Sequence, residues 1–513
     1  MPRAAKVCCQ LRPRLRTLAA TSPRLAEPPG PISVGAPGAS AASSRKRANR
    51  GSIGGRIHAW TRRGTLRDGR RYTRAPMDSA LTKTVSCEAE TSSGHVQAEA
   101  HFEAIILGGG PAGASCAAIL ARAGRRVLVI ERDRFPRFHV GESLLPLANP
   151  LLRRTGLDAR MGGLGVVEKF GATFLSECGR DSARIDFAEA FDVSDPRAMH
   201  VLREDFDTLL LDNAQEQGAE VWQEASVLTV DCEAFLPRVR VRLETGAELW
   251  VEGDFVLDAS GRSGILARQK NLRVADPELR KTALFAHFRG VPHLRGRNRG
   301  DIQVFCRESG GWGWLIPLPD GRMSIGFVFD NKEQSKSKTE SAEVCLDRWI
   351  AGLALLDDCR SSLRREGRAY WEADFSYSTR AYTGSNWLLL GDAASFLDPV
   401  FSSGVQIALA AGADAADALL AGLDAGASRR RRALKRFERL QRRRYRFYRH
   451  LVLGFYRPAF RKLMFQPEAW PAGARSLASL LAGQERPGWR ARWRVAMIFL
   501  TVFCMERRGT RSA

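Results

Sequence analysis

The residues that most clearly carry chemistry are the glycines of GGGPAG, residues 108–113. An apolar run, FEAIIL at 102–107, precedes them and predicts a buried strand. An Ala-rich segment over about 112–123 follows and predicts a helix, which Gly124 would end as a left-handed cap. A strand, a glycine-rich turn and a helix in this order are typical of a dinucleotide-binding unit.

Each glycine in GxGxxG has a separate task. Gly108 permits the tight turn, Gly110 lets a diphosphate approach the backbone, and Gly113 lets the helix pack closely on the strand. Pro111 and Ala112 open the helix, whose free N–H groups and positive dipole end would face the diphosphate.

An acidic residue stands where this unit needs one. A second strand over 127–130 ends at Glu131, 18 residues after Gly113. Its carboxylate can accept hydrogen bonds from ribose hydroxyls, and an acid there disfavours a phosphorylated nicotinamide cofactor. Arg132, the next residue, is included among the candidate cofactor-binding residues.

A second group of candidates comes much later in the chain. Apolar strands over 251–258 and 387–390 lead into DASGRSG (258–264) and GDAASFLDP (391–399), which puts Asp392 at a strand end, where it can hold a sugar-alcohol chain. The helix predicted after Gly404 and Val405 can aim its N–H groups at an anion or a ring edge. Arg203, four residues before Asp207 in a helical segment, is a further cofactor-binding candidate.

Together, these blocks resemble the FAD-dependent aromatic-hydroxylase superfamily over residues 101–460. Two more segments narrow the resemblance: VGESLLP (140–146) and GWGWLIP (311–317) are similar to segments of flavin-dependent halogenases, whose WxWxIP motif the second contains. The resemblance implies reduced FAD as cofactor, with O2 and chloride or bromide as co-substrates.

The halogenase resemblance also implies roles for particular residues. Lys169 matches the lysine that serves in halogen transfer, by donating a hydrogen bond to hypohalous acid or by forming a haloamine, and desolvation would lower its pKa. The backbone N–H groups of Ser403 and Gly404 match the halide site. The flavin face would be walled off by a set of strand residues: Trp312, Trp314, Ile316 and Pro317.

The match favours the branch acting on phenols or pyrroles, free or on an acyl or peptidyl carrier protein. The tryptophan branch has a Glu just before its Ser/Thr-Gly step, and this chain has Phe401 in that neighbourhood. A separate flavin reductase is expected because no second nucleotide fingerprint is evident. The alternative is an FAD-dependent monooxygenase or a geranylgeranyl-reductase-type enzyme; a basic nucleic-acid binder is a third hypothesis, which the motif order opposes, and we expect no nucleic acid as partner.

Most of the net positive charge of the chain lies in its first 76 residues. Residues 1–76 carry 17 Lys and Arg against two acids, so +15 of the net charge of +23 lies there. This segment is predicted to be disordered. We favour the interpretation that it is upstream sequence with Met77 as the true start; the alternatives are a transit peptide and a nucleic-acid-binding tail. Ten scattered cysteines without a CxxC pair and no run of 18 apolar residues predict a cytoplasmic protein without a metal site.

The expected fold class is α/β: a discontinuous, Rossmann-like FAD-binding domain over 101–420, after a leader over 1–100. An antiparallel β-sheet substrate lobe is inserted at about 165–200 and 270–380. A helical, Arg-rich C-terminal region over 421–513 would cap it. We interpret its basic segment, 429–461, as a solvated helix that covers the substrate lobe. The functional alternatives are docking to an acidic carrier and peripheral contact with a membrane.

Overall fold

The computed structural model describes residues 101–191, 193–308, 310–336, 340–373, 375–466 and 471–484, with Trp493, Met497 and Val502. The predicted leader, 1–100, and most of the terminal segment over 485–513 lie outside the described residues. The disorder predicted for the leader and the boundaries predicted for the three regions therefore stay predictions.

The nucleotide-binding elements form a mostly parallel sheet, in the order β7-β2-β1-β10-β9-β8 with β18 beside β10. Only β8 and β9 join it antiparallel. The strands are β1 (His101–Leu107), β2 (Val127–Ile130), β7 (Glu220–Trp222), β8 (Ser226–Asp231), β9 (Arg238–Arg242), β10 (Glu248–Asp258) and β18 (Trp387–Leu389). They come from three separated stretches of sequence, which confirms the Rossmann-like, discontinuous arrangement.

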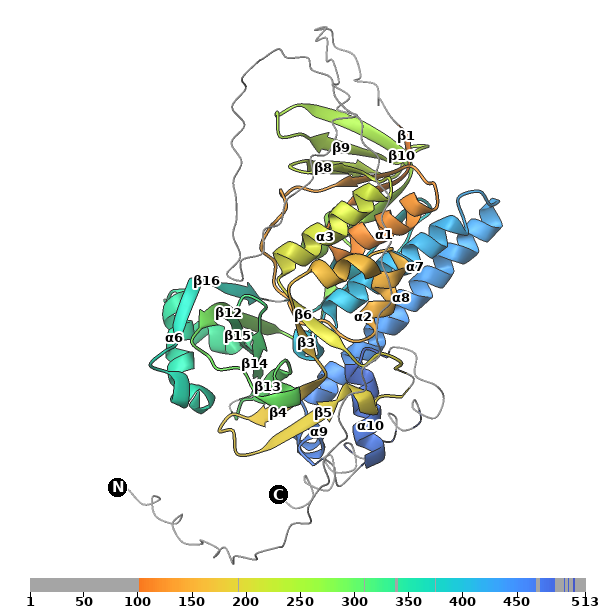
Figure 1. Ribbon diagram of the computed structural model, residues 1–513. Helices are drawn as coiled ribbons and strands as arrows, with labels where there is room; N and C mark the ends of the chain where they lie inside the picture. Colours follow the sequence, from red (N-terminus) through yellow and green to blue (C-terminus); the bar gives the residue numbers. More distant parts are fainter. Residues whose placement is uncertain are drawn as a thin grey trace, which may run out of the picture. The chain divides into compact units, whose positions relative to one another are not determined.

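Register brings the chemistry-bearing turns to one edge of this sheet. Leu107 is level with Asp258, and Asp258 is level with Leu389. Because parallel strands present their carboxyl ends at the same edge, the turns after β1, β10 and β18 meet there. Helices pack on the sheet and on each other (Figure 1): α1 (Pro111–Arg122), α2 (Ala148–Arg154), α3 (Arg203–Glu216), α4 (Ile265–Gln269) and α7 (Gly404–Leu420).

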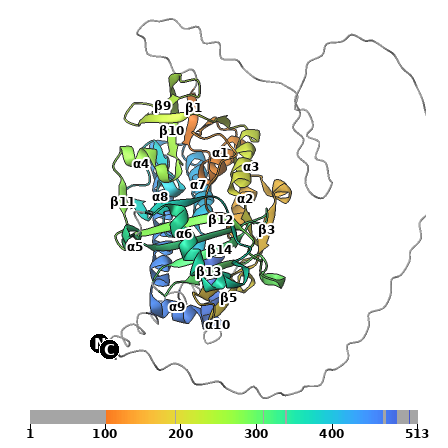
Figure 2. The ribbon, with the colours of Figure 1, turned by 90° about the vertical axis from the view of Figure 1, so that its left-hand side faces the viewer.

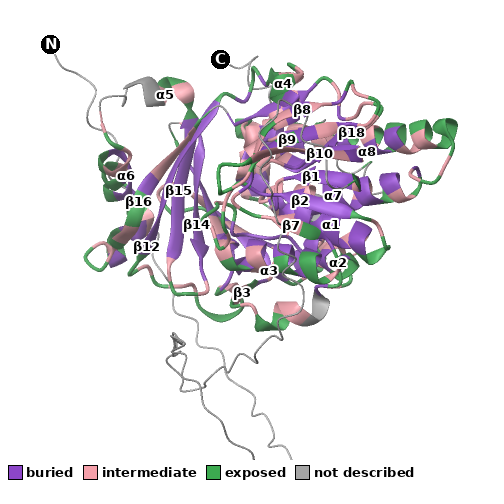
Figure 3. Cartoon of the chain, turned by 90° about the horizontal axis from the view of Figure 1, so that it is seen from above, coloured by how far each residue is buried: buried purple, intermediate pink, exposed green. Residues whose placement is uncertain are grey.

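The second lobe is a sheet in the order β16-β12-β15-β14-β13-β4-β5. It is antiparallel except that β13 runs parallel to β4, which confirms the expected substrate-lobe architecture. Figure 3 shows β14 and β15 buried along their length, while the outer helix α6 carries exposed residues. The elements are β4 (Gly171–Ser176), β5 (Ser182–Asp186), β12 (Lys281–Arg289), β13 (Ile302–Cys306), β14 (Trp312–Pro317), β15 (Met323–Asp330), β16 (Arg364–Ala373), α5 (Asn331–Lys336) and α6 (Ala342–Ala351).

Two short ribbons complete the strands. One pairs β3 (Val166–Lys169) with β6 (Ala198–Val201), and the other pairs β11 (Arg273–Ala275) with β17 (Tyr377–Thr379). The β3–β6 ribbon lies between the two large sheets (Figure 1). Lys169 is the last residue of β3, so its position is fixed by strand pairing.

The C-terminal region is helical where it is described: α8 (Ala427–Phe455), α9 (Pro458–Met464) and α10 (Pro471–Leu481). The predicted apolar face of the basic helix is confirmed, since Phe437, Tyr448, Leu451 and Val452 are buried. Figure 2 shows α8 running past both lobes, with α9 and α10 at the end away from β9. Among the described helices, none combines the length and apolar character needed to cross a membrane.

The close packing of α1 on β1 depends on a glycine. A Cβ on Gly113 would lie 1.9 Å from the carbonyl oxygen of Gly108, which is backbone and cannot yield easily. We expect Gly113→Ala to lower the free energy of unfolding by about 3 kcal/mol or more, because helix and turn must separate. Urea unfolding checks this. Gly426→Ala is the matched control, since a Cβ there meets nothing within 4 Å; equal stabilities of the two variants would contradict the packing argument.

Candidate active site

The glycine turn is open on the side where a diphosphate would approach. Gly110 is the N-cap of α1, and a Cβ built on it would meet only Arg137 Nη2, at 3.5 Å. Gly108 adopts φ +107° and packs against Ala259, so it must be glycine. The helix start at Pro111 and Ala112 leaves first-turn N–H groups without intrahelical partners. These features fit a diphosphate.

Glu131 orders this turn. Its carboxylate accepts hydrogen bonds from the backbone N–H of Gly109 at 2.7 Å and of Asp133 at 2.9 Å. A carboxylate offers about four lone-pair positions, so acceptor capacity remains for sugar hydroxyls. Arg132 is exposed and donates to Ser263 Oγ at 3.2 Å, which links this end to the DASGRSG segment.

Arg137 is a residue that sequence reasoning missed. Its guanidinium lies beside Gly110 and pairs with Asp207 at 3.3 Å. A positive charge at the open side of the glycine turn favours the binding of a diphosphate. The sequence feature that could have identified Arg137 is the basic segment RFPRF, which contains it and comes just after Glu131.

Asp392 is a carboxylate without a hydrogen-bonded partner on its side chain among the described residues. Desolvation raises its pKa to about 6, against the opposing charges of Arg203 and Arg262. Its backbone carbonyl accepts a hydrogen bond from the Tyr377 hydroxyl at 2.6 Å, which fixes the turn after β18. A half-buried acceptor in this position suits the hydroxyls of a sugar-alcohol chain.

The described contacts of the Arg203 side chain are with other residues of the chain. It forms a two-fold ion pair with Asp207, at 2.8 and 2.9 Å, and donates to the carbonyl of Val140 at 2.6 Å. It is buried, so this arrangement holds the VGESLLP segment in place. The contribution of Arg203 to cofactor binding stays a prediction, and its described contacts are structural.

The tryptophan pair lies on one face of β14. Trp312 and Trp314 are both buried, with ring centroids 5.6 Å apart, and Ile316 shares their face because side chains alternate along a strand. Gly326 on β15 provides the space for the Trp314 ring, which a Cβ would meet at 2.2 Å. Pro317 comes one residue after Ile316. Because successive side chains of a strand point to opposite faces, Pro317 lies on the other face of β14 and is not part of the predicted wall.

Asp398 connects the tryptophan wall to the loop before α7. Its carboxylate accepts from Trp312 Nε1 at 3.1 Å, from the Tyr456 hydroxyl at 2.6 Å and from the backbone N–H of Val400 at 3.1 Å. Burial raises its pKa to about 6, against these hydrogen bonds. The structure thus brings together the substrate-lobe strand, the FSSG loop and α8.

The FSSG loop has the backbone of an anion-binding nest. Ser402 adopts left-handed angles, φ 54° and ψ 25°, and Ser403 follows in right-handed ones, φ −83° and ψ −10°. Successive residues of this kind turn their N–H groups toward one point. In the described part of the chain, no backbone carbonyl accepts the N–H of Ser403 or Gly404. This fits the predicted halide site.

Lys169 is buried inside the protein, with 1% of its surface exposed. Its Nζ donates to Ser143 Oγ at 2.7 Å and lies 5.4 Å from the centre of the Phe187 ring. Burial lowers its pKa to about 7, although the charge of Asp301 acts in the other direction. An amine with this pKa is neutral in a large share of molecules at pH 7, as desolvation was predicted to make it.

Hydrogen bonds also fix the VGESLLP segment, which contains the Ser143 that accepts from Lys169. Glu142, next to Ser143, accepts a hydrogen bond at 2.9 Å from Nε2 of His287 on β12. The other ring nitrogen, Nδ1, lies 3.1 Å from Arg322 Nη1, which can only donate. Sequence reasoning missed Ser143 and these partners, because they come from segments up to 180 residues apart.

The mostly parallel sheet has a glycine turn after β1 and acidic residues just after β2 and β18, which defines a flavoprotein-type nucleotide fold. A buried lysine and a tryptophan-lined lobe are added to it. The chain belongs to the tryptophan halogenase family, whose model matches residues 103–197 and 188–463.

Curated and solved relatives agree with this membership. The flavin-dependent halogenase armH3 of Armillaria mellea is 33% identical over 346 residues, which cover 62% of this chain and 67% of that protein. The tryptophan 2-halogenase of Chondromyces crocatus is 33% identical, over 60% of this chain and 58% of its own length. The crystal structure of CmlS, a flavin-dependent halogenase, is 28% identical with a TM-score of 0.67, and the match covers 80% of this chain and 78% of CmlS.

The lowered pKa of Lys169 predicts a pH-dependent stability. The unfolded lysine keeps its proton up to about pH 10, whereas the folded one loses it above about pH 7. Between these values the unfolded state binds more protons, so the free energy of unfolding rises with pH. The rise, relative to Lys169→Met, should reach about 1.4 kcal/mol per pH unit.

Urea unfolding of wild type and Lys169→Met at several pH values from 6 to 9.5 measures this difference. The exposed Lys435→Met variant is the control for effects of lysine removal in general. Parallel stability curves for wild type and Lys169→Met would mean that the buried amine keeps its proton in the folded state.

Proposed function

We propose that this chain is an FAD-dependent halogenase that chlorinates or brominates a small aromatic substrate. The observation that carries the proposal is the burial of Lys169 on a strand between the two lobes, hydrogen-bonded to Ser143. When bound, reduced FAD with O2 would supply the oxidising power that converts chloride or bromide into hypohalous acid.

The residues at the sheet edge fit FAD. Gly108, Gly110, Gly113 and the start of α1 would hold its diphosphate, with Arg137 adding a positive charge. Glu131 and Arg132 would lie at the adenosine end, and the Asp392 carboxylate would accept hydrogen bonds from the ribityl hydroxyls. Gly404 and Val405, at the start of α7, would face the flavin end.

The halide would bind to the N–H groups of Ser403 and Gly404. Trp312, Trp314 and Ile316 would keep the organic substrate away from the flavin, so that only the small oxidised halogen species passes toward the lysine. The hydrogen bond from Trp312 to Asp398 supports this separation of substrate from flavin, because it connects the tryptophan wall to the loop that carries the proposed halide site.

Lys169 would direct the oxidised halogen to the substrate ring. A pKa of about 7 provides both forms that the two possible roles require: the ammonium donates a hydrogen bond to hypohalous acid, and the neutral amine can form a haloamine. Burial excludes water, which would otherwise compete for the electrophile.

For the substrate we propose a phenol or a pyrrole, because Phe401 stands near the position where the tryptophan branch has a Glu. The setting would be a cytoplasmic pathway of secondary metabolism, such as antibiotic biosynthesis, with a separate flavin reductase.

A carrier protein would present the substrate by docking on α8. Basic residues line an open groove there that suits an acidic surface: Arg429, Arg432, Lys435, Arg436 and Arg439. Peripheral contact with an anionic membrane is the rival use of the same charges.

The decisive experiment supplies the protein with FAD, a flavin reductase, NADH and bromide, and analyses an aromatic panel by mass spectrometry. Brominated products are expected only with the complete mixture. Lys169→Ala should lower product formation by about 10²- to 10⁴-fold while oxidation of reduced flavin continues. Turnover with NADH alone, without reductase or halide, would instead indicate a monooxygenase or reductase, and unchanged bromination by Lys169→Ala would remove the role of the lysine.

The halide site can be tested through the left-handed residue beside it. Ser402→Val should raise the KM for bromide roughly tenfold, because a β-branched residue resists φ +54° and would turn the amides away. Ser402→Gly, which accepts this conformation, is the matched control and should bind bromide about as well as wild type. If both variants keep the wild-type KM for bromide, the halide binds elsewhere.

A further inference from the structure

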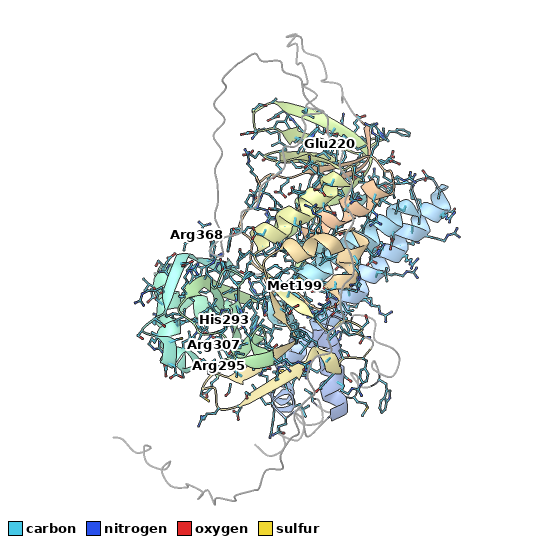
Figure 4. The ribbon with its side chains drawn as sticks, viewed as in Figure 1. Met199, Glu220, His293, Arg295, Arg307 and Arg368 are labelled. Atoms are coloured by element: carbon cyan, nitrogen blue, oxygen red, sulfur yellow. The ribbon has the colours of Figure 1, made fainter. Side chains whose placement is uncertain are left out.

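His200 is a second functional group beside Lys169. The register of the β3–β6 ribbon pairs Val167 with His200 and Lys169 with Ala198, and Ser143 pairs with His200 from the other side. Directly opposed residues of antiparallel strands share a face, as do residues two apart. Ser143, His200 and Lys169 therefore lie on the same face of this ribbon. Met199, labelled in Figure 4, marks β6 and its place between the two lobes.

The tautomer of His200 follows from the hydrogen bond that its ring makes with the described residues. Nε2 lies 2.7 Å from the carbonyl oxygen of Gly300, which can only accept, so Nε2 carries the proton and Nδ1 is a bare acceptor. Gly300 must be glycine for this contact, because a Cβ would lie 1.7 Å from the carbonyl oxygen of Glu168. The backbone thus fixes which nitrogen of His200 is free.

The free nitrogen has no hydrogen-bond partner among the residues that the structure describes. His200 has 0% of its surface exposed, and Nδ1 makes no hydrogen bond within the described residues. Burial, together with the positive charge of Lys169, keeps the pKa of His200 well below its usual value, so the ring stays neutral. A buried acceptor without a partner costs about 1–3 kcal/mol, which a donor from a bound molecule would recover.

We infer that His200 Nδ1 is the proton acceptor for the hydroxyl or ring N–H of the aromatic substrate. This inference rests on the proposed halogenase function and extends it to substrate recognition. As the ring gives electrons to the halogen held by Lys169, the substrate O–H or N–H becomes strongly acidic. His200 Nδ1 can then accept its proton although the pKa of His200 lies well below its usual value. The site would therefore select phenols and pyrroles that carry a free O–H or N–H.

The proposed step balances for a phenol and hypohalous acid. The new carbon–halogen bond forms as the oxygen–halogen bond breaks; the ring is oxidised by two electrons and the halogen is reduced. The hydroxyl proton moves to His200 Nδ1, and the released hydroxide takes the ring C–H proton to give water. His200 then returns its proton to the substrate oxygen.

The test uses two substrate pairs, resorcinol with 1,3-dimethoxybenzene and pyrrole with N-methylpyrrole, with bromide and the complete reductase system. Wild type should prefer the free O–H or N–H compound more strongly than hypobromous acid does in buffer. His200→Gln keeps an amide donor for Gly300 but removes the basic nitrogen. It should brominate resorcinol on the order of 100-fold more slowly and lose the extra preference, with flavin oxidation unchanged.

His450→Gln, at an exposed position on α8, is the matched control and should behave as wild type. A His200→Gln enzyme that keeps the wild-type preference would overturn the inference while leaving the halogenase function intact. Failure of wild type to brominate any of these compounds, or any member of the aromatic panel, would count against the proposed function instead.

A measurement on wild type covers the case in which His200→Gln does not fold. In protein labelled with ¹⁵N-histidine, His200 should show an unprotonated Nδ1 at neutral pH, and this signal should move upfield when resorcinol or pyrrole is added to saturation. A protonated Nδ1, or a signal that neither compound moves because only water occupies the site, would overturn the inference.

Discussion

The arrangement of this site depends on the removal of one amine from water. Lys169 ends a short strand inside the protein, and burial brings its pKa close to neutral. Such a lysine would be a poor choice for stability alone, because the folded state must bury an ionisable group whose hydrogen-bond partner, in the part of the chain that the structure describes, is the hydroxyl of Ser143. In the function proposed above, this cost would be offset by a use for the buried amine, which would guide a halogen electrophile away from water.

Several elements together hold the surroundings of this site in place. Trp312 and Tyr456 both donate to the Asp398 carboxylate, so the substrate-lobe strand, the loop before α7 and the end of α8 share one buried acceptor. On the other side, Glu142 and His287 hold the segment that carries Ser143. The lysine is thus positioned from one direction by the VGESLLP segment, and the wall that would separate it from the flavin is positioned from another.

The nucleotide end obeys a different constraint, which is close approach of backbone to backbone. Gly108 and Gly113 are needed because a side chain on either would meet a carbonyl oxygen. The same turn is left open at Gly110, beside the Arg137 guanidinium. The glycine turn and the FSSG loop are connected through α7, whose start carries the predicted halide amides and whose body packs on α1.

The sequence by itself determined the features that rest on local rules. The glycine turn, the acids at strand ends and the apolar strands are set by steric limits and periodicity within a few residues, so the Rossmann-like sheet, the antiparallel lobe and most candidate residues could be predicted. Only the tertiary structure decided which groups meet. The pairing of Lys169 with Ser143, the bare nitrogen of His200, the place of Arg137 and the removal of Pro317 from the wall all follow from strand register and burial. Those are properties of segments that are distant in sequence, and no local pattern records them.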